Sequence, residues 1–352
     1  MSVTRAWGRP ALWLGATVVS AFVVSGIVSG SQDKPAAGQG PGIERLDPAL
    51  DSLIAPDAKI ETLAEGYEWA EGPVWVKDGG YVLFSDVLKN TIHRWKQGEG
   101  AKPYLTPSGY TSSEPRGGET GSNGLTLDHQ GHLVLAQHGD RRVARMDAPL
   151  SSPQPKFVTL ADRFEGKRFN SPNDLVFKSN GDLYFTDPAY GMEKQWDDPK
   201  RELPFAGVFR RSVDGTVTLL TKDMTRPNGL AFSPDEKLLY VAQSDETAAI
   251  WRVFDVKPDG TIANGRVLLD VTSMVKSKPG LPDGMKIDAK GNLFATGPGG
   301  VLVITPQGKH LGTIRTGQAT ANCAFGDDGQ TLYITADMYL MRVRLKTKGA
   351  GF

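Results

Sequence analysis

One pattern of alternating hydrophobic and polar residues recurs along the chain. Each copy starts with a polar residue, usually followed by glycine, and continues as a short alternating strand, a glycine-containing turn and a second apolar strand. The copies lie about 50 residues apart on average, and they start at Glu71, Asn123, Asn173, Asn228, Asp283 and Asn322. Dipeptides such as Asn180-Gly181 and Asp259-Gly260, which favour β-hairpins, separate the strands. The pattern predicts a repeat protein built from antiparallel strands.

The length of this repeat selects the fold class. About 50 residues with four short strands is typical of one blade of a β-propeller, whereas helical repeats would show a 3.6-residue apolar period. We therefore predict an all-β chain, with a six-bladed β-propeller over residues 57–348. The ring is expected to close where the strand Lys59 to Leu63 pairs with the C-terminal strands Met338 to Lys346, because this covers the last exposed strand edges.

The N-terminal segment differs from the repeats. Arg5 and Arg9 precede an uncharged stretch from Pro10 to Gln32, so residues 1–30 are predicted to be a signal peptide or an N-terminal membrane anchor. Both alternatives place the folded part outside the cytoplasm, either periplasmic or secreted. Residues 31–56 are expected to form a flexible tether, since Asp33 to Gly42 is rich in Pro, Gly, Ala and Gln.

Charge and cysteine content narrow the range of partners and metals. The chain has 40 basic and 40 acidic residues and no basic block, which argues against nucleic-acid binding and against membrane contact beyond an N-terminal anchor. The expected partner is a small molecule. Cys323 is the only cysteine, so an intramolecular disulfide and a cysteine-based zinc site are both excluded. Its apolar neighbours predict a buried, unreactive thiol.

The six residues that start the repeats are candidates for a metal site. In a propeller the first strand of each blade lines the central channel, so these two carboxylates and four amides are expected to converge at one level. A shell of oxygen ligands suits Ca²⁺, with Mg²⁺ and Mn²⁺ also open, and Zn²⁺ would tolerate such a site although it prefers nitrogen or sulfur. The alternative is that Asn-Gly and Asp-Gly serve only as turns. Six copies in register, including a glutamate, favour a metal or substrate site.

A second repeated acid has a different expected role. It follows the second strand of several repeats in a turn context, where carboxylates accept hydrogen bonds from nearby backbone N–H groups. We expect it to be structural, and it occupies positions Asp86, Asp187, Asp245 and Asp337.

Several ordered motifs resemble those of one known family. They are Glu71-Gly72-Pro73, Ser171-Pro172-Asn173-Asp174, Thr186-Asp187-Pro188-x-Tyr190-Gly191, Arg226-Pro227-Asn228-Gly229 and Pro282-Asp283-Gly284-Met285. Over about residues 60 to 347 the chain resembles the gluconolactonase family, which includes regucalcin, the senescence marker protein. This resemblance implies a divalent metal held by Glu71, Asn173, Asn228 and Asp283. It also implies lactone hydrolysis with Asp283 as the general base.

The resulting hypothesis is metal-dependent hydrolysis of a sugar-derived lactone, in which the cation polarises the carbonyl group. Asn123 and Asn322 by their register, and His138 after a second strand, are candidates for substrate contacts. Two insertions, residues 107–122 and 192–204, are expected at the channel mouth, where loops set substrate choice. Two alternatives stay open: another metal-dependent esterase or phosphotriesterase, and a non-catalytic, calcium-stabilised propeller that binds a ligand.

Overall fold

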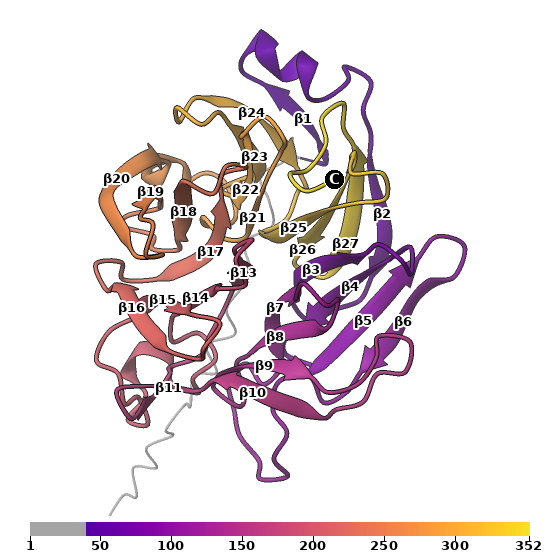
Figure 1. The fold of residues 1–352 in the computed structure, drawn as a ribbon. Coiled ribbons are helices and arrows are strands. Elements are labelled where there is room, and N and C mark those ends of the chain that lie inside the picture. Colours follow the sequence, from indigo (N-terminus) through magenta and orange to yellow (C-terminus); the bar gives the residue numbers. More distant parts are fainter. Residues whose placement is uncertain (1–39) are drawn as a thin grey trace, which may run out of the picture. The chain divides into compact units, whose positions relative to one another are not determined.

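The structure is a computed structural model that describes residues 40–352, and its strands form six antiparallel blades around a central axis (Figure 1). Five blades have four strands each, and one has a fifth strand at its outer edge. The prediction of an all-β, six-bladed β-propeller is confirmed. No helix within residues 40–352 is long and apolar enough to cross a membrane.

The strands of each blade are given in order from the central axis outward. Blade 1 contains β3 (Ala70–Val76), β4 (Tyr81–Asp86), β5 (Thr91–Lys96) and β6 (Gly100–Leu105). Blade 2 contains β7 (Ser122–Leu127), β8 (Leu133–Gln137), β9 (Arg142–Met146) and β10 (Phe157–Ala161). Blade 3 contains β13 (Leu175–Phe177), β14 (Leu183–Asp187), β15 (Gly207–Arg211) and β16 (Val217–Thr221). A small hairpin of β11 (Arg163–Phe164) and β12 (Lys167–Arg168) separates blades 2 and 3.

The second half of the ring repeats this plan. Blade 4 contains β17 (Pro227–Phe232), β18 (Leu238–Gln243), β19 (Ile250–Val256) and β20 (Ile262–Asp270). Blade 5 contains β21 (Met285–Ile287), β22 (Leu293–Gly297), β23 (Gly300–Ile304) and β24 (His310–Arg315). Blade 6 contains β25 (Thr320–Gly326), β26 (Thr331–Ala336), β27 (Tyr339–Arg344) and, from the start of the propeller, β2 (Ile60–Glu65).

The ring is closed by one N-terminal strand. β2 pairs antiparallel with β27, with Ile60 opposite Val343, as the sequence predicted. The first strands of neighbouring blades contact one another around the axis, in the order β3, β7, β13, β17, β21, β25 and back to β3. Closure therefore places the start of every repeat next to the central channel.

Part of the expected tether is ordered, which corrects the prediction for residues 31–56. Strand β1 (Gly42–Arg45) pairs with β24 as the fifth strand of blade 5, and a short 3₁₀ helix (Pro48–Ser52) follows it (Figure 1). Leu50, Leu53 and Ile54 are buried in the hydrophobic cluster between blades 5 and 6. Burial of these apolar side chains stabilises the segment. The prediction of a tether was based on Asp33 to Gly42, which contains no apolar side chain of comparable size. The predicted signal peptide or anchor, residues 1–30, lies outside the described residues.

Apolar side chains fill the space between adjacent blades. Trp251 and Val253 of blade 4, for example, pack in one cluster with Leu293 and Leu302 of blade 5. Trp251 is fully buried and is among the largest such side chains in the described part of the chain. Burial of each large apolar side chain contributes roughly 1.5–3 kcal/mol, so these interfaces make up much of the stability of the propeller.

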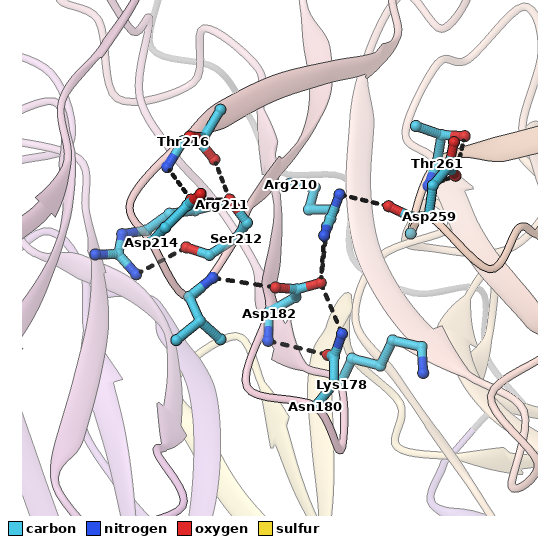
Figure 2. A network of polar contacts seen from close by, with 12 residues as sticks. Lys178, Asn180, Asp182, Arg210, Arg211, Ser212, Asp214, Thr216, Asp259 and Thr261 are labelled. Atoms are coloured by element: carbon cyan, nitrogen blue, oxygen red, sulfur yellow. Dashed lines mark hydrogen bonds and ion pairs between the residues drawn. The ribbon is translucent and has the colours of Figure 1, made fainter.

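Polar contacts also join neighbouring blades at their turns. In blade 3, Asp182 accepts hydrogen bonds from Arg210 Nε at 2.8 Å and from the Val213 backbone N–H at 3.1 Å (Figure 2). Arg210 Nη1 also donates to the carbonyl oxygen of Asp259, in a turn of blade 4, at 2.7 Å. Asp182 is almost fully buried, and Arg210 forms an ion pair with it at 2.7 Å.

Candidate active site

β-Bulges mark the first strands at the positions where polar side chains meet the channel. The pairing register shifts between Glu71 and Val74 in β3, and between Pro227 and Leu230 in β17. Equivalent shifts occur beside Asn123 in β7 and beside Asn322 in β25. A bulge inserts an unpaired residue and changes the direction of its side chain. The bulge thus lies at or next to the repeated polar residue in four blades, whereas Asn173 and Asp283 lie just before β13 and β21.

The glycines that follow these polar residues allow the first strands to approach one another closely. A Cβ atom at Gly72 would lie 2.1 Å from the carbonyl oxygen of Asn123, and Gly72 also has a positive φ of 51°. A Cβ atom at Gly284 would lie 2.0 Å from Cγ of Asn322. These glycines thus serve packing around the axis, a reason different from the hairpin turns that Asn-Gly and Asp-Gly suggest in the sequence.

A cavity of about 440 Å³ opens at this level of the channel. Its wall includes five of the six repeat residues: Glu71, Asn123, Asn173, Asn228 and Asp283. Within the described part of the chain, Oδ1 of Asn123 and Oδ1 of Asp283 are buried and have no hydrogen-bond partner. Buried polar atoms are nearly always paired in proteins, so these two acceptors indicate a place for a cation or a bound ligand.

The carboxylates of this cavity raise one another's pKa values. Burial raises the pKa of Asp283 well above its ordinary value, and the charges of Glu71, Asp174 and Glu119 raise it further. Burial also raises the pKa of Glu71, although the Gly72 backbone N–H, which donates to Glu71 Oε2 at 2.7 Å, opposes this shift. The site therefore favours protons or a bound cation that neutralises its negative charge.

Two of the amides lie side by side. Asn173 Nδ2 donates to Asn228 Oδ1 at 2.5 Å, and Asn228 Nδ2 donates to the hydroxyl of Ser244 at 3.1 Å. Ser244 in turn donates to the carbonyl oxygen of Pro282, next to Asp283. Hydrogen bonds thus join Asn173 to Asn228 and connect Asn228, through Ser244, to the backbone beside Asp283.

With this geometry in view, comparison with known proteins identifies the family. A profile described as the SMP-30/Gluconolactonase/LRE-like region matches residues 69–337. The chain belongs to this family. The gluconolactonase of Zymomonas mobilis is 41% identical over 314 residues, which is 87% of each chain. The solved structure of a gluconolactonase from Xanthomonas campestris is 30% identical, covers 89% of this chain and 99% of its own, and superposes with a TM-score of 0.73. These relatives confirm the predicted family and agree with the predicted class of enzyme, a lactonase.

Regucalcins are more distant relatives within the same family. The Xenopus laevis regucalcin is 28% identical over 284 residues, which is 79% of this chain and 86% of its own. A structure described as a calcium-binding protein, regucalcin, from Agrobacterium tumefaciens is 18% identical and superposes with a TM-score of 0.63. At this identity the likeness shows the shared fold alone.

The residues of the cavity fit a hard divalent cation. No group of three or more His, Cys, Asp or Glu side chains within residues 40–352 is placed to hold a metal ion, so amide oxygens would have to complete any ligand set. Two carboxylates, Glu71 and Asp283, and two amides, Asn173 and Asn228, share one wall. The unpartnered Oδ1 of Asp283 is an acceptor still available to a cation. All-oxygen ligation of this kind suits Ca²⁺.

Two expected substrate contacts have other partners in the structure. His138 is fully buried and lies outside the cavity wall; its Nδ1 is 2.7 Å from Glu119 Oε2 and its Nε2 is 3.1 Å from Asn173 Oδ1. Asn322 also lies outside the wall; its Oδ1 accepts a hydrogen bond from the Cys323 backbone N–H at 2.9 Å, and its Nδ2 donates to Asp174 Oδ2 at 3.5 Å. Both side chains are therefore paired within the protein, and substrate contact stays a prediction for them. Asn123 remains on the cavity wall, as expected from its register.

Other residues of the cavity wall do not occupy the repeated position, so the repeat pattern does not predict them. Glu119 comes from the insertion 107–122. Tyr190 lies just before the insertion 192–204, and Arg226 lies just before strand β17. Arg226 and Tyr190 belong to the quoted motifs, which was the one available signal. Arg116 links the regions of both insertions, because its guanidinium donates to the carbonyl oxygens of Gly139 and Gly191.

Proposed function

We propose that this protein hydrolyses a sugar lactone at the 440 Å³ cavity. The observation that carries the proposal is the convergence of Glu71, Asn173, Asn228 and Asp283 on one wall, with an unpartnered carboxylate oxygen on Asp283. The 41% identity with a gluconolactonase supports the same substrate class. Trp69, half-buried at this wall, offers an apolar face to the C–H groups of a sugar ring.

We further propose that Glu71, Asn173, Asn228 and Asp283 hold one divalent cation. Ca²⁺ is the ion that these oxygen donors favour, and Zn²⁺, Mn²⁺ and Mg²⁺ are the alternatives to test. When bound, such a cation supplies Lewis acidity that polarises the lactone carbonyl and stabilises developing negative charge. The two amides are suited to this role because, being uncharged, they supply oxygens without adding to the repulsion between Glu71 and Asp283.

Asp283 is the proposed general base. One oxygen of its carboxylate would hold the cation, and the other accepts a proton from water as the water oxygen attacks the lactone carbonyl carbon and forms a tetrahedral intermediate. The bond from this carbon to the ring oxygen then breaks, and the proton passes from Asp283 to the departing alkoxide. The products are an open-chain hydroxy acid and the regenerated carboxylate. Burial and then the neighbouring acids raise the pKa of Asp283, so its carboxylate binds a proton more readily than that of a solvent-exposed aspartate.

A substrate panel tests this proposal directly. The purified chain, treated with chelator, is assayed with sugar lactones, aryl esters and phosphotriesters, alone and with Ca²⁺, Zn²⁺, Mn²⁺ or Mg²⁺. We expect hydrolysis of sugar lactones that depends on an added cation. Preference for aryl esters or phosphotriesters would replace the lactonase proposal with another hydrolase on the same site. Cation binding with no hydrolysis of any compound would favour a non-catalytic, ligand-binding propeller.

We also propose that the protein is exported. The support is the sequence of residues 1–30, which has the charge pattern of a signal peptide or an anchor. Cell fractionation together with N-terminal sequencing of the mature protein tests this. Recovery from the periplasm or medium with residues 1–30 removed indicates cleavage, recovery with membranes indicates an anchor, and recovery of the full chain from the cytoplasm contradicts export.

A further inference from the structure

Arg226 lies between the central cavity and a second, neighbouring pocket. It lies just before β17 and lines both the 440 Å³ cavity and a neighbouring pocket formed by Trp196, Phe205 and Lys222, among others. Its side chain is half-buried. The residue is thus close to the proposed metal ligand Asn228 in the chain, but it is not one of the repeat residues at the axis.

The guanidinium of Arg226 makes no hydrogen bond and no ion pair within residues 40–352. In contrast, Lys278, the other cation on the cavity wall, pairs with Glu44 at 3.0 Å. A guanidinium presents five N–H donors in a fixed plane. Partial burial restricts their access to water, so they are available to a ligand in the cavity.

Aromatic packing holds this guanidinium in place. Its Cζ lies 5.4 Å from the ring centroid of Trp196, and the Cζ of Arg201 lies 5.7 Å from the same ring. Tyr190 packs edge-on against Trp196 at 5.6 Å. Trp196 belongs to the insertion 192–204, so this insertion acts on the cavity through Arg226. A side chain positioned before the ligand arrives loses little entropy on binding.

We propose that Arg226 binds the hydroxyl oxygens of the sugar ring away from the reacting carbonyl, and so selects polyhydroxylated lactones over plain ones. This inference rests on the proposed lactonase function. The charge of the cavity favours a neutral polyol over an anionic substrate, because Glu119 and Glu246 line the same wall and would repel an anion. These two carboxylates can also accept hydrogen bonds from the hydroxyls, while Arg226 donates to them.

Kinetics with two lactones tests the assignment. Arg226→Ala is compared with the unaltered protein on D-glucono-1,5-lactone and on δ-valerolactone, which has the same ring without hydroxyls. A hydrogen bond to a charged group contributes about 1.5–3 kcal/mol, so we expect KM for the sugar lactone to rise about tenfold to hundredfold. For δ-valerolactone, kcat and KM should stay within about twofold. Arg226→Lys should recover part of the loss. The matched control is Lys222→Ala, which removes a cation from the neighbouring pocket only.

Binding measurements separate this inference from the proposed function. Calorimetric titration with D-glucono-1,5-lactam, a neutral analogue whose amide bond resists hydrolysis, reports recognition without turnover. We expect about tenfold or weaker binding to Arg226→Ala and unchanged binding to Lys222→Ala, with equal melting temperatures. Equal losses on both lactones, or unchanged lactam binding, would overturn the role of Arg226. If the unaltered protein binds the lactam but hydrolyses neither lactone, the proposed function fails while the role of Arg226 stands.

Discussion

At the scale of single residues, a substitution of Asp283 tests its proposed role as the general base. Its Oδ1 is free of hydrogen bonds, and burial and the nearby acids raise its pKa. Asp283→Asn keeps an oxygen ligand but removes the proton acceptor, so we expect kcat to fall by about 10²–10⁴-fold while cation binding persists. Steady-state kinetics and the cation-induced shift in melting temperature measure the two effects. Asp235→Asn, in an exposed turn, is the control. Turnover that survives in Asp283→Asn would remove it from the mechanism.

Asp187 links a buried carboxyl group to the pH dependence of stability. Its two oxygens accept backbone N–H groups of Asn170 and Ser171 at 2.8 Å each, which confirms the structural role expected from the sequence. Burial nevertheless raises its pKa to about 7 from 3.8. A folded pKa above the unfolded value means that its stabilising contribution is complete below pH 3.8 and is lost as the pH rises through about 7.

The expected result is a difference in slope between two proteins. From pH 4 to pH 7 the unfolding free energy of the native chain should fall relative to that of Asp187→Asn, by at most about 1.4 kcal/mol per pH unit. Denaturant titrations at a series of pH values measure this. Asp214→Asn serves as control, because hydrogen bonds lower the pKa of Asp214 to about 2, below this range. Parallel curves for the native chain and Asp187→Asn would contradict the prediction.

At the scale of elements, residues 42–54 form a segment, called the strap below, that contacts both blade 5 and blade 6. β1 extends blade 5, and Leu50 packs with Val343 and Leu345 of the last blade and its C-terminal extension. The segment therefore supplements β2, whose pairing with β27 closes the ring. Two consecutive N-terminal elements thus hold the first and last parts of the propeller together.

Truncation of one side chain tests how much this strap contributes. Leu50 is fully buried, so Leu50→Ala should lower the unfolding free energy by about 2–5 kcal/mol through lost burial and a residual cavity. Leu46, which is 56% exposed, provides a matched control, and Leu46→Ala should change stability by less than about 0.5 kcal/mol. Equilibrium unfolding in urea measures both. Equal effects of the two substitutions would mean that the strap is not part of the cooperative fold.

At the scale of the whole molecule, one cation in the channel would connect several blades. Its proposed ligands come from blades 1 and 4 and from the segments just before blades 3 and 5, so binding should stabilise the ring as a unit. At a free Ca²⁺ concentration of 100 times Kd, the gain is about 2.7 kcal/mol. We expect chelator to lower the melting temperature, Ca²⁺ to restore it, and Glu71→Gln to weaken the response. A melting temperature indifferent to chelator and to all four cations would count against the site.

Much of the propeller follows from local sequence alone. Strand alternation, turn glycines and a repeat near 50 residues are short-range properties, so the number of blades, the closing strand and the polar ring at the axis were all predictable. The ordered structure of residues 42–54 could not be predicted in this way. It depends on Leu50, Leu53 and Ile54 packing against residues that lie almost 300 positions later in the chain, and local composition does not reveal contacts over such a separation.

The site divides in the same way. The sequence by itself determined which residues recur in register, and hence that Glu71, Asn123, Asn173, Asn228 and Asp283 share one wall. Only the tertiary structure decided that His138 is enclosed between Glu119 and Asn173 and that Asn322 faces Asp174. It also decided that the guanidinium of Arg226 packs on Trp196 and makes no hydrogen bond or ion pair within residues 40–352. Register is a property of each repeat, whereas burial and pairing depend on side chains from different blades and insertions, which meet only when the ring closes.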